Sequence, residues 1–119
     1  MEAVLREDFR RNTVAEGLMR GRPDTAFRRL LWMVFTGTRG GINRMRIIAT
    51  LREQPMNAHR LALQLGMDYK TITHHLSVLQ RNHLIVKTGE GYGAMYFPSP
   101  ELEEHYEDFL SIRGRVKVN

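Results

Sequence analysis

The chain of 119 residues is long enough for one domain with a single modest core and too short to add a separate ligand-binding domain. It contains no cysteine, which excludes disulfides and thiolate metal sites within the chain. The net charge of +5 is unevenly placed: residues 1–98 hold 15 Lys and Arg against 8 Asp and Glu, whereas residues 99–119 hold 3 against 5. The basic part favours a polyanionic partner.

Residues 1–23 show no continuous pattern. Apolar residues such as Phe9 could form one edge of a short element, but Gly17, Gly21 and Pro23 interrupt anything longer. We expect an N-terminal arm here, with a frayed terminus as the alternative. The charged first residues do not resemble a secretory signal, so the expected location is cytoplasmic.

Residues 24–41 are expected to form an N-terminal helix followed by a glycine-rich loop. Asp24 is the predicted N-cap of a helix from Thr25 to about Thr36, ended by Gly37. One face carries Phe27, Leu30, Leu31 and Val34, whereas Trp32 and Met33 lie off that face. Burying two sides of a helix in so small a domain favours a dimer interface. A deep core within one chain and contact with a membrane are the alternatives, although the apolar run Leu30 to Phe35 is far shorter than the roughly 20 residues that span a bilayer.

The segment Gly37-Thr-Arg-Gly-Gly41 predicts a tight connection, because three glycines are costly in a helix. It could cradle a phosphate, yet it lacks the Gly-Lys-Ser/Thr ending of a nucleotide-binding loop. Asn43 is the predicted N-cap of the next helix, which runs to about Glu53 and is closed by Gln54-Pro55. Its inward residues are Met45, Ile47, Ile48 and Leu51, and its outward residues are Arg44, Arg46 and Arg52.

The stretch from Asn57 to His83 predicts two helices with a tight turn between them. Asn57 suits the N-cap of the first, Gly66 suits its left-handed C-terminal position, and Asp68 suits the N-cap of the second. In the second helix, Ile72, Leu76 and Leu79 make one apolar stripe, and the opposite side carries Lys70, Thr73, His74, Ser77 and Arg81. Such a polar face suits the major groove of DNA, so the pair is interpreted as a helix-turn-helix. An ordinary helical hairpin in water is the alternative.

Two β-prone runs, Ile85 to Thr88 and Ala94 to Phe97, flank the glycine-rich tip Gly89-Glu-Gly-Tyr-Gly93. They predict a hairpin, which forms the wing at residues 85–97. The predicted fold class is therefore mainly α with a small β-hairpin wing (α+β), a winged helix-turn-helix at residues 42–98 with extra N- and C-terminal helices.

Residues 99–119 are expected to form a C-terminal helix and tail. Pro100 suits the first helical turn, and the helix should run to about Ile112. Its inner stripe is Leu102, Tyr106, Phe109 and Leu110, and its outer face is acidic, so it should lie away from DNA and against the N-terminal helix of its own or a partner chain. The two terminal helices together predict a homodimer. The predicted interface residues are Phe27, Leu31, Trp32, Phe35, Leu102, Tyr106 and Phe109.

The segment Asn43 to Phe97 resembles the winged helix-turn-helix regulators of the arsenical-repressor (ArsR-like) type. The matching runs are Asn43-Arg-Met-Arg-Ile-Ile, Leu61-Ala-Leu-Gln-Leu-Gly-Met, Lys70-Thr-Ile-Thr-His-His-Leu-Ser-Val-Leu79 and His83-Leu-Ile-Val, and the Gly-Thr-Arg-Gly-Gly lead-in is similar to archaeal members. The resemblance implies a recognition helix in the major groove, a hairpin on an adjacent groove or backbone, and a dimer made by terminal helices.

One departure from this family concerns metals. Metal-sensing relatives carry a Cys-x-Cys pair where this chain has Asn57 and His59, so we expect no metal sensor and no cofactor. The expected C-terminal helix carries Glu101, Glu104, His105 and Asp108 at i, i+3, i+4 and i+7, and some relatives bind zinc between paired C-terminal helices. Acidic residues with one His are more typical of a solvated helix face. His75 lies near the apolar stripe and is expected to pack there rather than to contact bases.

The predicted function is sequence-specific binding of double-stranded DNA by a homodimeric transcription regulator, with the recognition helix at about residues 69–82. No nucleophile motif or nucleotide loop is present, so no enzyme is expected. A winged-helix module for protein–protein interaction is the alternative, and RNA binding is disfavoured because an aromatic stacking platform is lacking. The predicted DNA-binding residues are Arg44, Arg46, Tyr69, Lys70, Thr71, Thr73, His74, Ser77, Arg81, Lys87 and Tyr92.

Overall fold

The computed structural model describes residues 14–116, with side chains described from Thr25 onward. It confirms a mainly α fold with a small antiparallel sheet. The helices are α2 (Val14–Thr36), α3 (Gly41–Glu53), α4 (Ala58–Leu65), α5 (Tyr69–Arg81), α6 (Pro100–Glu104) and α7 (Tyr106–Arg115). The strands are β1 (Met56–Asn57), β2 (Ile85–Thr88) and β3 (Met95–Pro98), and a short 3-10 turn, η1 (Gly91–Gly93), lies at the tip of the wing.

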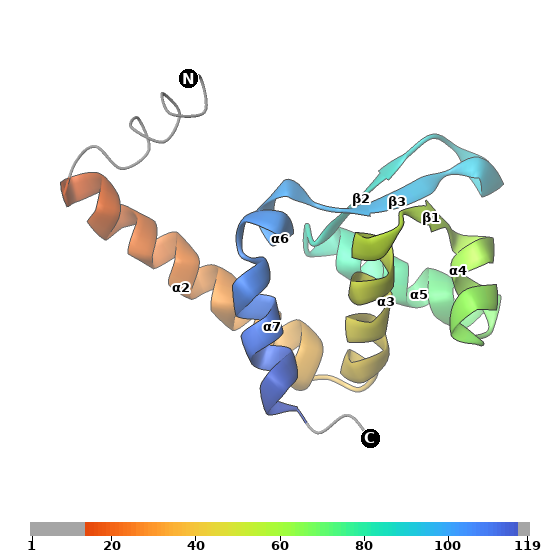
Figure 1. Cartoon of the computed structure of the whole chain (residues 1–119), viewed down its shortest axis with the longest axis horizontal. Coiled ribbons are helices and arrows are strands. Elements are labelled where there is room, and N and C mark those ends of the chain that lie inside the picture. The colour runs from red at the N-terminus through yellow and green to blue at the C-terminus, as the bar shows by residue number, and fades with distance from the viewer. Residues whose placement is uncertain (1–13, 117–119) are drawn as a thin grey trace.

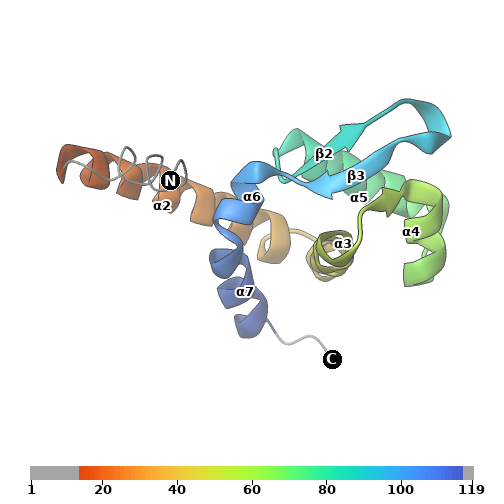
Figure 2. The ribbon, with the colours of Figure 1, turned by 45° about the horizontal axis from the view of Figure 1, so that its top comes forward.

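Helices α3, α4 and α5 form one body with the sheet, and α2 extends from it as a long rod (Figure 1). Helix α7 packs across the C-terminal half of α2. The β2–β3 wing projects beside α5 on one side of the molecule, whereas α7 points to the other side (Figure 2). The surface built by α5 and the wing is thus separate from the surface built by α2 and α7.

Helix α2 begins at Val14, so the expected start at Thr25 with Asp24 as N-cap is wrong. Gly17, Gly21 and Pro23 lie within the helix instead of ending it. Propensity is a local preference, and a proline interrupts the hydrogen bonds of one turn without preventing helix on either side. Part of the expected arm is therefore helical, and its first 13 residues lie outside the described part of the chain.

The corner between α2 and α3 is closed by two glycines. Helix α3 starts at Gly41 and not at the expected N-cap Asn43, because Gly40 turns the chain with φ 87° immediately before it. A Cβ at Gly41 would lie 2.1 Å from the carbonyl oxygen of Phe35. Only glycine lets the start of α3 approach the end of α2 this closely.

The three strands are ordered β1–β3–β2 and are antiparallel. The wing pairs Ile85 with Pro98 and Thr88 with Met95, which confirms the predicted hairpin with its second strand one residue later. Strand β1 was not predicted, because two residues carry no periodicity. It pairs Met56 with Tyr96 and so joins the start of α4 to the wing.

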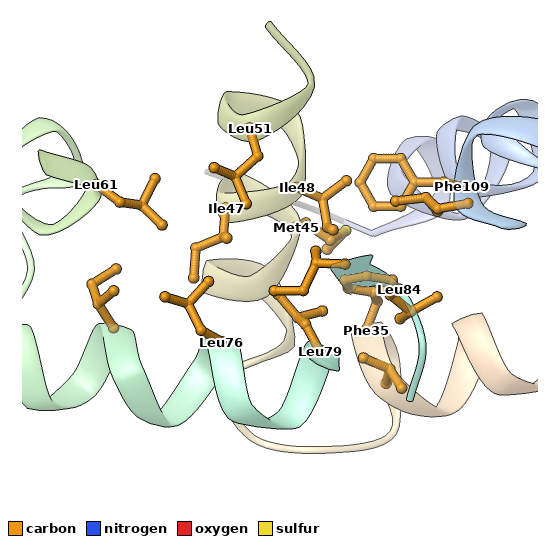
Figure 3. Close-up of a cluster of buried hydrophobic side chains, with 14 of the residues drawn as sticks. Phe35, Met45, Ile47, Ile48, Leu51, Leu61, Leu76, Leu79, Leu84 and Phe109 are labelled. Carbon is orange, nitrogen blue, oxygen red and sulfur yellow. The ribbon is translucent and has the colours of Figure 1, made fainter. Parts of the chain in front are cut away.

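The core lies between α3 and α5 and continues to α2 and α7 (Figure 3). Leu76 and Leu79 point from α5 toward Ile47 and Ile48 of α3, as the predicted stripes require. Phe35 and Phe109 meet edge to face at 5.2 Å, which fastens α7 to α2. Of the two expected arrangements, the structure therefore shows the C-terminal helix packed against the N-terminal helix of its own chain.

This intramolecular packing corrects the predicted dimer interface. Leu31, Phe35, Leu102 and Phe109 are fully buried within one chain and cannot also contact a partner. The ring centroids of Phe27 and His105 are 4.8 Å apart, and Cζ of Arg52 lies 3.8 Å from the centroid of the Tyr106 ring. Apolar periodicity cannot distinguish a partner within the chain from one in another chain. Of the seven predicted residues, Trp32 alone stays exposed, at 46%.

The expected single C-terminal helix is divided at His105, whose φ of −115° and ψ of 29° are not helical. Ser99 caps α6 by accepting a hydrogen bond from the backbone N–H of Leu102 at 3.0 Å. Ion pairs from Arg52 to Glu103 and from Arg28 to Asp108 tie both halves to α3 and α2. Among the side chains described, those of residues 25–116, no group of three or more His, Asp or Glu could hold a metal. None of the described helices is long and apolar enough to cross a membrane.

Candidate nucleic-acid interface

The helix-turn-helix is set by three local signals that the structure confirms. Asn57 Oδ1 accepts a hydrogen bond from the backbone N–H of Arg60 at 2.8 Å, which caps α4. Gly66 ends α4 in the left-handed conformation with φ 68°. Asp68 Oδ2 then accepts from the backbone N–H of Lys70 at 3.1 Å and caps α5. These caps fix where α5 begins and therefore which of its residues face outward.

Helix α5 separates an apolar face from a polar one. Ile72, Leu76 and Leu79 are buried, and the exposed side carries Lys70, His74, Ser77 and Arg81. Arg81 Nη1 donates to Ser77 Oγ at 3.2 Å, so the guanidinium lies along the helix. The exposed side therefore offers hydrogen-bond donors and acceptors and positive charge, with no bulky apolar group.

Thr71 and Thr73 lie on opposite flanks of this outer face. Thr71 is exposed, whereas Thr73 is half-buried, and its hydroxyl donates to the carbonyl of Lys70 at 3.0 Å. Thr73 also lines a hollow of about 380 Å³ between α5 and the wing, together with Ser77, Gln80, Arg81 and Tyr96. Sequence reasoning missed Gln80 and Tyr96, since no sequence pattern indicates that Tyr96 of β3 lies beside α5.

The hydroxyl of Tyr96 stays protonated in this hollow. Burial raises the pKa of Tyr96 above its ordinary value, and the neighbouring Tyr69 raises it further. A protonated phenol can donate a hydrogen bond as well as accept one. Tyr96 is thus a further polar group at the edge of the predicted reading surface.

The wing carries an exposed aromatic residue at its tip. Tyr92 is 82% exposed and lies between two glycines, and its ring centroid is 6.4 Å from that of Tyr69 at the start of α5. Lys87 and Glu90 are both exposed on the wing and offset each other in charge. The wing therefore adds contact area and one cation to the surface of α5, rather than a strong positive field.

The two arginines predicted from α3 are placed differently. Arg46 is exposed but donates to Asn43 Oδ1 at 3.1 Å and to the carbonyl of Leu65 at 3.3 Å. Arg44 is only 3% exposed, which corrects its assignment as a DNA contact. A guanidinium buried beneath the α2–α3 corner cannot reach a phosphate. His75 is buried against Arg44, which confirms the expected packing role.

The profile described as "Bacterial regulatory protein, arsR family" matches residues 43–87. Residues 43–87, called the arsR-family segment below, are therefore similar to the helix-turn-helix of that family. This arsR-family segment runs from the third residue of α3 to the wing and contains both caps and the whole of α5. It covers less than half of the chain, and no curated protein sequence matches the chain.

Solved structures resemble the chain around the arsR-family segment as well. The transcriptional regulator HlyU from Vibrio vulnificus superposes with a TM-score of 0.54 at 21% identity, covering 80% of this chain and 88% of that one. A second match is the homodimeric winged helix-turn-helix DNA-binding domain of a possible ArsR-family regulator from Mycobacterium bovis. It superposes with a TM-score of 0.52 at 18% identity, covering 64% of this chain and 70% of that one. AbfR of Staphylococcus epidermidis superposes with a TM-score of 0.56 at 17% identity, covering 98% of this chain and 82% of that one. At these identities the likeness establishes the winged-helix fold.

Proposed function

We propose that this protein is a transcription regulator that binds double-stranded DNA as a homodimer, with α5 in the major groove and the wing on the adjacent groove or backbone. The observation that carries the proposal is the outer face of α5 within an arsR-family segment, where Lys70, His74, Ser77 and Arg81 project without apolar residues between them. A helix of this width fits the major groove, where base edges present distinguishable donors and acceptors.

Charge placement supports the same orientation. Lys70, Arg81 and Lys87 lie exposed on α5 and the wing, against the exposed Asp68 and Glu90. Helices α6 and α7 carry five acidic residues against Arg113 and Arg115. Phosphates would therefore be attracted to α5 and the wing rather than to α6 and α7.

The homodimer is proposed from the outer side of α2 and α7. Trp32 and Met33 are exposed there, and a groove of about 390 Å³ between the two helices is lined by Trp32, Met33 and Ile112 among others. Covering this surface with a second copy would bury a tryptophan that one chain leaves in water. A two-fold dimer would present two copies of α5 and would bind a roughly palindromic site. Such a regulator would act in the cytoplasm, and its glycine-rich α2–α3 corner is the feature that resembles archaeal members of the family.

The experiment that tests the proposal begins with genome-wide mapping of bound DNA, which supplies candidate sites. Binding to one such duplex and to a random duplex is then titrated over a range of salt concentrations. We expect binding to both to weaken steeply with salt and the mapped site to be preferred. Absence of binding at low salt would refute the proposal and favour a protein-interaction module.

A further inference from the structure

Arg44 is a buried charge at the junction of three helices. Its Nε and Nη2 donate to the carbonyl of Val34 at 3.3 and 3.1 Å, and Nη2 also donates to the carbonyl of Arg39 at 3.2 Å and to the hydroxyl of Thr38. Its Nη1 is 3.2 Å from Nδ1 of His75 on α5. One side chain of α3 therefore contacts the end of α2, the α2–α3 corner and the recognition helix.

The guanidinium is stabilised by carbonyl groups in place of an acidic side chain. Within the described residues it forms no ion pair, and burial lowers the pKa of Arg44 from its ordinary value. Val34 belongs to the last turn of α2, where carbonyls lack helical partners and the helix dipole is negative. The position of the charge therefore depends on where α2 ends.

His75 must be neutral to complete this arrangement. Nδ1 can accept a hydrogen bond from Arg44 only when it is unprotonated and offers its lone pair, so the proton of the neutral ring lies on Nε2. Burial lowers the pKa of His75, and the charges of Arg44 from α3 and His74 from α5 lower it further. The corner also closes on the ring, since a Cβ at Gly40 would lie 2.8 Å from Cε1 of His75. A proton on Nδ1 would replace an attraction with a repulsion between two cations.

We propose that Arg44 and His75 are positioning residues for DNA reading: their contact locks α5 to the end of α2, and protonation of His75 releases this lock in mild acid. The inference rests on the proposed function, because α5 is taken as the reader and α2 as part of the dimer. In a dimer, the placement of α5 on α2 would set the distance between the two recognition helices. Arg44 and His75 would thus affect specific binding without touching DNA.

The test compares the full-length chain with His75→Gln across a range from about pH 5.5 to 8. The glutamine amide oxygen can accept from Arg44 but does not titrate. For the parent chain we expect the preference for the mapped site over a random duplex to fall in acid, by up to about tenfold at pH 5.5, while His75→Gln keeps its preference. His83→Asn removes an exposed histidine at a left-handed position that asparagine tolerates, so it should follow the parent profile.

Two outcomes would overturn the inference. An acid-induced loss that persists in His75→Gln would place the titrating group elsewhere, and a flat parent profile would show that protonation does not release α5.

A readout without DNA separates this inference from the proposed function. Amide-exchange protection of α5 in the free protein should fall in acid for the parent chain and should not fall for His75→Gln. Unchanged protection in the parent would refute the lock even if DNA binding is confirmed. If the parent chain lost amide-exchange protection of α5 in acid but bound no duplex, the proposed DNA binding would be refuted, whereas the contact between Arg44 and His75 would still be shown to hold α5 in place. Arg44→Met should lower the specific preference by about tenfold at neutral pH, and its circular dichroism would show whether it folds.

Discussion

Gly41→Ala should destabilise the fold through one contact that the structure locates. The added Cβ would lie 2.1 Å from the carbonyl oxygen and 2.6 Å from the carbonyl carbon of Phe35, and both are backbone atoms. No rotamer change can relieve this contact, so the end of α2 and the start of α3 must separate by about 1 Å. Overpacking of this kind costs typically 1–3 kcal/mol, and because the obstacle is backbone we expect a value of about 3 kcal/mol.

The assay is urea denaturation at matched protein concentration, because the stability of the proposed dimer would depend on concentration. We expect a lower midpoint at an unchanged slope, together with a melting temperature lower by about 10 °C. Gly114→Ala is the matched control, since nothing lies within 4 Å of its Cβ and it occupies α7, where alanine favours helix by up to about 1 kcal/mol. A Gly41→Ala chain as stable as the parent would refute the close approach of α2 and α3.

Four further predictions concern assembly, pH, metals and the wing. Trp32→Glu should turn the dimer into a monomer in sedimentation, whereas Leu63→Glu, which replaces another exposed apolar residue, should not; a monomeric parent chain would contradict the dimer. The unfolding free energy should fall as pH drops below the ordinary His pKa of 6.5, because the lowered pKa of His75 makes the unfolded chain bind more protons; a pH-independent unfolding midpoint would contradict this. Zinc and thiophilic metals should not release the protein from DNA, and a zinc-induced release abolished by His105→Ala would contradict this. Lys87→Ala should weaken specific and random duplexes alike and lower the salt slope by about one, and an unchanged slope would remove Lys87 from the phosphate contacts.

Local chemistry made the helix-turn-helix predictable. Asn57, Gly66 and Asp68 each have a side chain or backbone preference that acts within a few residues, and all three take the predicted positions. The stripe from Ile72 to Leu79 likewise faces the core, because its apolar residues recur at helical spacing on one side of α5. The wing followed from its glycine-rich tip and β-prone flanks.

Long-range packing accounts for what the sequence did not indicate. Arg44 looks like a surface residue by type, and only the end of α2 packed over it shows that carbonyls replace water around the guanidinium. Phe109 belongs to a regular apolar stripe, but the stripe does not say that Phe35 of the same chain covers it. Strand β1 exists only because β3 offers a free edge to Met56.

The central claim is that α5 reads DNA sequence through its exposed face. The most direct measurement is the ratio of affinities for a mapped site and a random duplex, compared between the parent chain, Thr73→Ala and His74→Ala at several salt concentrations. Loss of a base contact should cost about 1–3 kcal/mol on the specific site alone, and we expect the larger fall in the ratio for His74→Ala, because Thr73 is half-buried and its hydroxyl already donates to Lys70. If both variants kept the parent ratio, α5 would not be the reader, and the winged helix would have to act as a protein-interaction module.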